Sequence, residues 1–245
     1  MGITSIAWTD RTRNLVYGCR KIDIDVLTGA CVKCYIWRGL PRYGVNPDIL
    51  TYLNVQNAIK DFQKWSKDPS IVRIFLNNYS DTFHEEIPFT TIDLWHEKII
   101  NAFPNFQFQL LTKRIGRAML YYRQRGRVPN NIWVGCTIGA KNRLFRLSQL
   151  RQIPARVRWV SFEPLLEDLG DFDLKGISWA VCGGESDIKN PRPMDLQWAT
   201  NLQRICERDS VAFFFKQRGG KGFDGAGGNI CPCCNSKHQE FPKVN

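Results

Sequence analysis

The stretch FQFQLLTKRIGRAMLYYRQRGRVPNNIWVGC, residues 106–136, decides the fold that we expect for this chain. Residues 106–111 are mostly apolar and of strand length, and residues 115–124 have the periodicity of a helix. Residues 132–136 form a second apolar run. Strand, helix and strand in this order predict a parallel βαβ unit.

The same alternation continues through most of the chain. Further strands are predicted at 71–76, 157–162, 179–182 and 211–216, and further helices at 49–65, 90–102, 141–150 and 196–208. Thr90 and Asp93 form a possible capping box for the second of these helices. About six buried strands separated by helices indicate an α/β fold with a parallel sheet, either doubly wound or a full or partial (β/α) TIM-type barrel. The barrel fits best.

The domain limits follow from glycine content. Residues 219–228 contain six glycines in ten positions, which predicts a break between a barrel domain, 1–218, and a Gly/Cys-rich C-terminal tail, 219–245. At 245 residues and 43% apolar content, the chain is long enough for one large α/β domain.

Cysteine usage and the N-terminal residues indicate the compartment. Nine cysteines is an odd number spread over a long chain, which favours free or metal-bound thiols in a reducing cytosol. Residues 1–13 carry Asp10, Arg11 and Arg13 and have no apolar core, so they do not form a signal peptide. The apolar runs are of strand length. We therefore expect a soluble, cytoplasmic protein without a membrane partner.

The net charge of +11 predicts attraction to polyanions. The basic residues concentrate in 113–127 and 141–158, and Tyr121 and Tyr122 interrupt the first stretch. Basic residues with interleaved aromatics suit a nucleic-acid backbone and its stacked bases. A solvated helix face of a basic protein is the alternative interpretation.

Three cysteines near the N-terminus, Cys19, Cys31 and Cys34, are the strongest chemical signal in the sequence. The Cys-x-x-Cys step lets two sulfurs turn toward one centre, and three thiolates without a neighbouring fourth ligand leave an iron site open for catalysis. Two other interpretations stay open. One is a redox Cys-x-x-Cys pair beside an unrelated Cys19, and the other is a zinc site closed by a distant ligand.

A second thiol-rich group lies in the tail. Cys231, Cys233, Cys234 and His238 are of the type and number that bind zinc or an auxiliary iron–sulfur cluster. Exposed reduced thiols are the alternative. The other three cysteines lie in apolar strands or a helix and are predicted to be core residues: Cys136, Cys182 and Cys206.

Polar residues follow the predicted strands, where parallel α/β folds place their active sites. The candidates for lining a cofactor and substrate pocket are Asn77, Ser80, Asp81, Lys113, Glu163, Gly183, Gly184 and Glu185. We assign Lys113, Glu163 and the nearby His84 to catalysis, and the other six residues to cofactor binding.

Each of these assignments has a structural alternative. The two glycines can form an ordinary turn before a helix, and His84 can be a capping or core residue. A carboxylate beside Pro164 needs a cationic or hydroxyl partner if it is buried. For Glu163, the alternative is therefore a salt bridge to Arg158 or Lys113.

The cysteine loop and the segments that follow the predicted strands together resemble an uncharacterised, phage-associated branch of the radical S-adenosylmethionine (SAM) superfamily. The matching phrases are IAWTD (6–10), GC (18–19), CVKCY (31–35), NNYSDTFHE (77–85), LTKR (111–114), SFEPLL (161–166), GGES (183–186) and FFFKQ (213–217). The resemblance implies a partial TIM-type barrel and a [4Fe–4S] cluster on Cys19, Cys31 and Cys34. It also implies SAM as a ligand of that cluster and a flavodoxin or ferredoxin as electron donor. In the wider superfamily three residues and then two separate the cysteines, whereas eleven residues separate Cys19 from Cys31 here.

The resemblance implies a reaction but no substrate. Reductive cleavage of SAM would give a 5′-deoxyadenosyl radical that takes hydrogen from a substrate, for which a nucleic acid or a nucleotide is the candidate. The rival hypothesis is a non-catalytic, zinc-stabilised nucleic-acid-binding protein that uses both cysteine groups structurally. A metal-independent, phosphate-binding barrel enzyme is a third hypothesis, and it leaves the cysteine triplet unexplained.

Overall fold

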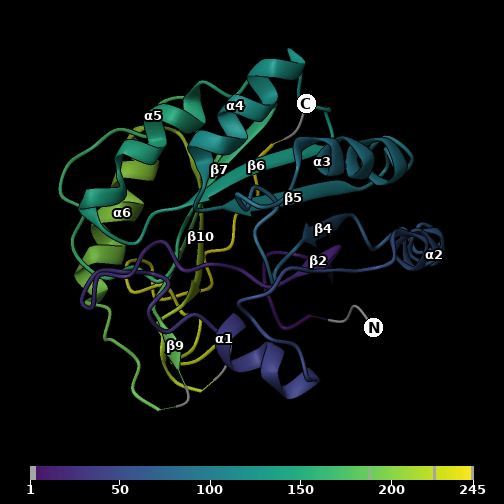
Figure 1. Cartoon of the computed structure of the whole chain (residues 1–245). Coiled ribbons are helices and arrows are strands. Elements are labelled where there is room, and N and C mark those ends of the chain that lie inside the picture. Colours follow the sequence, from purple (N-terminus) through teal and green to yellow (C-terminus); the bar gives the residue numbers. More distant parts are fainter. Residues whose placement is uncertain (1–3, 188, 223–224, 244–245) are drawn as a thin grey trace.

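The chain folds around one parallel sheet of seven strands. The computed structural model describes residues 4–187, 189–222 and 225–243. In sheet order the strands are β1 (Arg11–Arg13), β4 (Arg73–Leu76), β5 (Gln107–Thr112), β6 (Ile132–Thr137), β7 (Val157–Phe162), β8 (Trp179–Gly183) and β10 (Ala212–Gln217). The sheet is curled into a half-barrel (Figure 1). Within the described ranges β1 and β10 remain unpaired with one another, so the barrel does not close.

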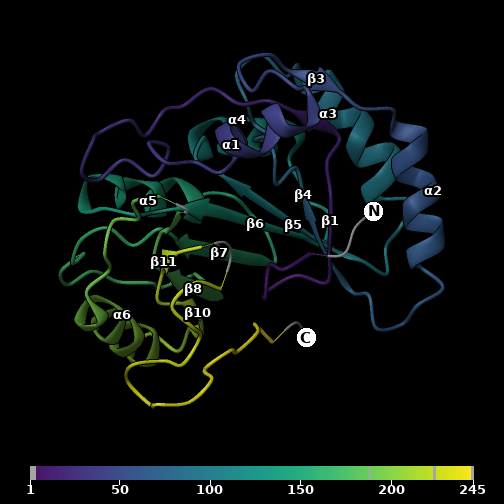
Figure 2. The ribbon, with the colours of Figure 1, turned by 90° about the horizontal axis from the view of Figure 1, so that it is seen from below.

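The longer helices follow one another around the outside of the sheet (Figures 1 and 2). They are α2 (Val55–Trp65), α3 (Phe89–Trp95), α4 (Ile115–Arg125), α5 (Phe145–Arg151) and α6 (Leu196–Arg208). A π turn, His96–Ile100, extends α3, and a 3-10 turn, Lys141–Arg143, precedes α5. The arrangement is the one expected when each strand is followed by a covering helix.

Several short helices and strands lie near the carboxyl ends of the sheet strands. The helix α1 (Ile36–Gly39) and a 3-10 turn (Leu40–Tyr43) follow the N-terminal cysteines. Two short strands, β2 (Val16–Tyr17) and β3 (Thr51–Tyr52), pair antiparallel, and β9 (Ser186–Asp187) pairs parallel with β11 (Gly220–Lys221). These pairs hold the connecting loops near the sheet.

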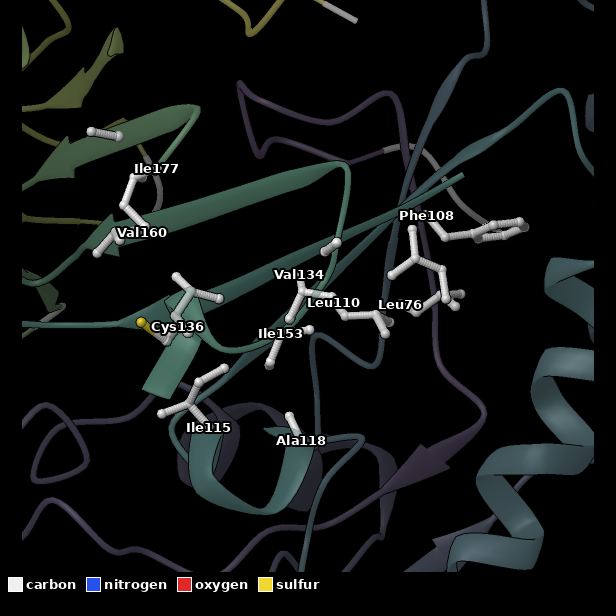
Figure 3. Packing of buried hydrophobic residues seen from close by; sticks show 14 of the residues in the cluster. Leu76, Phe108, Leu110, Ile115, Ala118, Val134, Cys136, Ile153, Val160 and Ile177 are labelled. Carbon is white, nitrogen blue, oxygen red and sulfur yellow. The ribbon is translucent and has the colours of Figure 1, made fainter. Parts of the chain in front are cut away.

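The outer face of the sheet packs against the helices in one continuous hydrophobic cluster. Figure 3 shows Ile115 and Ala118 of α4 directed toward Val134 and Cys136 of β6. All four side chains are at most 1% exposed, and burial of a side chain the size of isoleucine contributes about 1.5–3 kcal/mol. Cys136 is thus a core residue, as predicted, and so are Cys182 and Cys206.

The inner face carries a separate cluster of tryptophans. Trp159 and Trp179 lie with their ring centroids 5.2 Å apart, and Trp8 packs on Trp159 at the same distance. Gly135 permits this packing, because a Cβ atom there would overlap the Trp159 indole. The indoles and their aromatic and aliphatic neighbours pack the interior of the half-barrel.

All six predicted strands are present, and the sheet has a seventh. The strand β1 was not predicted, because Arg11–Arg13 has three residues and no apolar run. Its pairing with β4 makes it a strand: Arg11 lies opposite Ile74. The helix predicted at 49–65 begins only at Val55, since Thr51 and Tyr52 pair with β2 and the Asn54 side chain accepts the Gln56 N–H as a cap.

Two expectations for the helices are wrong. Thr90 and Asp93 form no capping box: α3 starts at Phe89, and the Asp93 carboxylate accepts bonds from Tyr121 Oη and Arg125 instead. Tyr121 and Tyr122 are 2% and 1% exposed, because they face the core side of α4. They are therefore unavailable for stacking on nucleic-acid bases.

The C-terminal segment returns to the sheet. Gln239 forms a bridge with Phe214 of β10, and the Phe241 ring lies 5.4 Å from both Phe214 and Trp179. Cys231 is 1% exposed. The segment therefore covers the β10 edge of the half-barrel. Among the described residues, no helix combines the length and apolar content that crossing a membrane requires.

Candidate active site

A cavity of about 530 Å³ lies at the carboxyl ends of the strands. This volume falls within the range of roughly 300–1,000 Å³ typical of ligand sites. Its walls include the last inward-facing residues of four strands, Leu111, Thr137, Ser161 and Lys216, and Trp8 lies among its lining residues. The cavity thus lies where parallel α/β folds place their sites.

The three N-terminal cysteines all line this cavity. Cys31 is buried, and Cys19 and Cys34 are half-buried. They come from the loop between β2 and α1, which covers the mouth of the half-barrel. The structure therefore brings Cys19, Cys31 and Cys34 together, although eleven residues separate the first two.

The beginning of the cysteine loop is anchored by the segment between β4 and α3 and by the segment that precedes β3. Ser80 Oγ donates to the Gly18 carbonyl at 2.6 Å, and the Cys19 N–H donates to the Pro47 carbonyl at 2.9 Å. Gly18 has φ +94°, and a Cβ atom there would clash with the Ile49 carbonyl. A glycine before Cys19 is therefore required by the backbone.

A buried ion pair anchors the middle of the loop. Asp23 accepts bonds of 2.7 and 2.8 Å from the two terminal nitrogens of Arg146 in α5, and both side chains are at most 4% exposed. Arg143 Nε lies 3.0 Å from the same carboxylate. Although burial opposes ionisation, the bonds and charge of Arg146 hold the Asp23 pKa below its usual range.

Two cations following β5 face the cysteines. Arg114 Nη1 lies 3.7 Å from Cys19 Sγ. Burial opposes the charge of Lys113, but neighbouring Cys31 and Cys34 raise its pKa above the ordinary value. Burial raises the Cys19 pKa to about 12, with the Asp81 charge adding to it and Arg114 and Lys113 opposing it. The Cys19 sulfur therefore favours the thiol form, and a bound metal centre would displace its proton.

Asp81 lines the cavity, but its carboxylate is occupied by the protein. It accepts bonds from Thr112 Oγ at 2.7 and 2.9 Å and from the Lys113 N–H at 3.2 Å, and Arg114 Nη1 lies 3.3 Å away. These contacts fix the end of β5. Asp81 thereby positions the two cations that face the cysteines.

Three predicted site residues do not line the cavity: Asn77, His84 and Gly183. Asn77 has φ +59°, and its side chain accepts the Leu15 N–H and donates to Thr82 Oγ1. The His84 ring contacts the backbone N–H groups of Arg20 and Glu86, each at 3.2 Å. Burial, followed by the Arg114 charge, lowers the His84 pKa. Asn77 and His84 hold the chain around the cavity and do not reach into it.

Glu185 and Gly184 lie at the rim and are held by neighbouring segments. Glu185 pairs with Arg192, which approaches through both Nε and its backbone N–H, and Lys33 Nζ lies 3.9 Å from it. A Cβ atom on Gly184 would collide with the Arg218 carbonyl. Close packing of two protein segments therefore explains Gly184, and approach to a ligand is not needed to explain it.

Glu163 and Lys216 form an ion pair on the cavity wall. Lys216 Nζ lies 2.6 Å from Glu163 Oε1, and Gln217 Nε2 donates to the same oxygen at 3.3 Å. The Glu163 carboxylate thus pairs with Lys216 in β10. Arg158, one of the two partners considered from the sequence, instead donates to the Gly176 and Ile153 carbonyls.

A second cavity, of about 450 Å³, adjoins the first and was missed by the sequence analysis. Its basic lining residues are Lys33, Arg38, Arg42 and Lys189, and it shares Lys33, Cys34, Trp37 and Arg38 with the first cavity. Among the described residues that line it, Asp187 is the one acid, and it pairs with Arg38. The basic residues that follow Cys31 and Cys34 in sequence were a local signal, but Lys189 joins them only through folding.

The tail cysteines form a second group of potential ligands. One sulfur each from Cys231 and Cys234 and one ring nitrogen of His238 all lie within 4.8 Å of one another. Cys233, also predicted as a ligand, is exposed and lies outside this group. All three residues of this group are among the four ligands predicted from the sequence.

Comparison with known proteins gives a family and no function. No curated protein and no solved structure matches the chain. One family, described as "Protein of unknown function (DUF5131)", matches residues 3–235. Since this match extends over nearly the whole chain, with the cysteine loop, every strand of the half-barrel and Cys231 within it, the protein belongs to the DUF5131 family.

Proposed function

We propose that this protein is a radical SAM enzyme whose [4Fe–4S] cluster is held by Cys19, Cys31 and Cys34. The observation that carries the proposal is their convergence on one cavity at the carboxyl ends of a parallel half-barrel. Among the described residues, that cavity is lined by no further cysteine and by no histidine. Three thiolates without a fourth leave one iron of a cluster open to a ligand.

The surroundings of the cysteines support an anionic centre. A cluster bound by three thiolates carries negative charge, and Lys113 and Arg114 provide positive charge beside the sulfurs. The ligand atoms of Cys231, Cys234 and His238 in the tail all lie within 4.8 Å of one another, as a single ion needs. The sulfurs of Cys19, Cys31 and Cys34 do not form such a close group. Wider separation agrees with a cluster, because its thiolates bind different irons.

When bound, the cluster and SAM would supply one-electron cleavage of a carbon–sulfur bond, and with it a 5′-deoxyadenosyl radical. The protein's own residues bind, orient and exclude water. Trp8 and Phe75 of the inner cluster line the cavity together with the cysteine loop, and these apolar walls would exclude water from a bound reactant. Glu163 and Lys216 offer an acceptor and a donor on the cavity wall, where the amino and carboxylate groups of SAM or a polar substrate would bind.

An anionic substrate is favoured by the second cavity. This space lies beside Cys34, and its lining combines four basic residues with the Asp187 carboxylate. The basic residues are Lys33, Arg38, Arg42 and Lys189. Phosphate groups of a nucleotide or nucleic acid suit such a site. This location replaces α4 as the proposed binding surface, because Arg125 of α4 pairs with Asp93 and the α4 tyrosines are buried.

A reducing, cytoplasmic setting agrees with the cysteines, since all nine are free. It would also provide an electron donor of the flavodoxin or ferredoxin type. In the laboratory, dithionite can replace that donor.

The test is anaerobic preparation of the full chain, followed by iron and sulfide analysis and incubation with SAM and dithionite. We expect about four irons per chain, a brown colour and release of 5′-deoxyadenosine. Replacement of Cys19, Cys31 and Cys34 by alanine should abolish all three. Cys233→Ser, which removes an exposed cysteine elsewhere, should leave them unchanged.

The same experiment separates the rival hypothesis. A colourless protein that contains zinc at the N-terminal cysteines and leaves SAM intact would contradict the enzyme and favour a zinc-stabilised nucleic-acid-binding protein. Binding of nucleic acid alone does not distinguish the two, because both have a basic surface.

A further inference from the structure

We infer that Cys231, Cys234 and His238 bind one zinc ion, which fixes the C-terminal segment to the end of β10. The site is separate from the cavity of the proposed enzyme, which none of the three residues lines. The inference does not depend on the proposed function. It rests on the ligand geometry, on the support of the histidine and on the contacts that connect the site to the sheet.

The backbone around the two cysteines is folded as a tight turn. The Cys231 N–H donates to the Ser236 carbonyl at 2.9 Å, and the Asn235 N–H donates to the Cys231 carbonyl at 3.0 Å. Asn235 has φ +50°, the left-handed conformation that reverses the chain after Cys234. The turn places both sulfurs on one side, as a Cys-x-x-Cys zinc site requires.

His238 is held in position for the third bond. Its Nδ1 lies 3.8 Å from Cys234 Sγ, and its Nε2 lies 3.3 Å from Glu240 Oε1. A carboxylate on the far ring nitrogen fixes the tautomer and leaves the near nitrogen free for a metal, an arrangement common around protein-bound zinc. The other Glu240 oxygen accepts the Phe213 N–H at 3.1 Å, so β10 itself positions this support.

The size and chemistry of the group favour zinc over an iron–sulfur cluster. All three ligand atoms lie within 4.8 Å of one another, a separation that suits a single ion. Two thiolates and an imidazole are preferred zinc ligands. Gln203 Oε1 lies 3.0 Å from Cys231 Sγ, so an oxygen is available next to that sulfur for the fourth position.

The site is joined to the strand that lines the active cavity. The His238 carbonyl accepts the Phe215 N–H at 2.7 Å, and the next two residues of β10, Lys216 and Gln217, line the cavity. Zinc bound by His238 would therefore hold the turn from Cys231 to His238 against β10. Its removal should loosen the wall that carries the Glu163–Lys216 pair.

The experiment measures zinc in the full chain, with Cys19, Cys31 and Cys34 replaced by alanine so that the N-terminal cysteines bind no metal. We expect one zinc ion per chain. Replacement of that zinc by Co²⁺ should give the visible bands of a tetrahedral site with thiolate charge transfer. Cys234→Ser and His238→Ala change side chains outside the core, and both should lose the zinc and the cobalt bands. Cys233→Ser, the neighbouring cysteine, should keep them.

A second readout reports the coupling to β10. Zinc removal by a chelator should speed amide exchange of residues 213–217, and zinc addition should reverse the change. Zinc content that is unaffected by Cys234→Ser and His238→Ala would overturn the inference, as would equal loss in Cys233→Ser. The variant used in this experiment lacks Cys19, Cys31 and Cys34. Absence of zinc from its tail would therefore leave the proposed radical chemistry unaffected, and absence of radical chemistry in the wild type would leave the zinc site unaffected.

Discussion

Replacement of Asp23 by asparagine tests whether the cysteine loop depends on one buried ion pair. The carboxylate joins the loop to Arg146 of α5 by two bonds, and Arg146 also donates to the Thr137 carbonyl. Asparagine keeps the shape and one acceptor oxygen but removes the charge. The variant therefore leaves the buried Arg146 guanidinium without its opposite charge and should release the loop between Cys19 and Cys31.

The magnitude follows from the burial of both groups. A hydrogen bond to a charged group contributes about 1.5–3 kcal/mol, and breaking a buried pair on one side costs about 3–5 kcal/mol. Since asparagine retains one neutral bond, we expect a loss near the lower end, about 3 kcal/mol. That corresponds to roughly a hundredfold increase in the population of the detached loop.

Amide hydrogen exchange measures how often this loop detaches. Amides of residues 20–31 should exchange roughly a hundredfold faster in Asp23→Asn, and iron bound by anaerobically prepared protein should fall. The folded-state pKa of Asp23 is lowered, so its contribution is present above the unfolded pKa of about 4 and is lost as the pH falls through the folded pKa. The difference between wild type and variant should therefore be full at pH 7 and shrink in acid.

Two controls make the result specific. Asp25 lies in the same loop but is exposed and accepts only local bonds from Leu27 and Thr28, so Asp25→Asn should leave exchange near Cys31 almost unchanged. A double-mutant cycle with Arg146→Met should show strong coupling. Exchange in Asp23→Asn equal to that of Asp25→Asn, or additive effects in the cycle, would refute the reasoning.

Three further changes test the core, the pH dependence and the electrostatics. Trp159 is fully buried among the inner tryptophans, so Trp159→Ala should lower the free energy of unfolding by about 3–5 kcal/mol in urea titrations, whereas Leu120→Ala on the exposed side of α4 should change it little. Burial lowers the His96 pKa to about 4, so stability should fall by about 3 kcal/mol as the pH drops from 6.5 to 4, and His96→Gln should remove this dependence in the same titrations. Lys113→Met should reduce the iron content of anaerobically prepared protein while Lys113→Arg retains it, and equal iron in both variants would contradict the role of this charge.

Local sequence patterns predicted most of the sheet. Apolar runs such as 132–136 and 179–182 became strands, because a run buried on both faces has few other stable arrangements. The strand β1 escaped detection because its residues are charged and its existence depends on pairing with β4. Strand ends also located the cavity correctly, since Ser80, Lys113 and Glu163 all line it.

The roles of individual site residues were harder to predict. Asn77 and Asp81 both follow β4, yet the side chain of Asn77 turns back to the Leu15 backbone while Asp81 reaches the cavity wall. Such turns depend on backbone angles that residue type alone does not specify. The basic second cavity depends on contact between Arg38 and Asp187, which lie 149 residues apart.

The long gap between the first two cysteines is bridged by the fold. The Cys31 N–H donates to the Asp23 carbonyl at 2.9 Å, so residues 24–30 form a side excursion that starts and ends at the same place. Only residues 20–22 then separate Cys19 from Asp23, the residue to which the Cys31 backbone is bonded. Three residues is also the first cysteine spacing of the radical SAM superfamily, to which we propose that this protein belongs. Because Arg146 fixes Asp23 at this junction, it also fixes the place of Cys31, and the excursion can lengthen without moving the sulfurs.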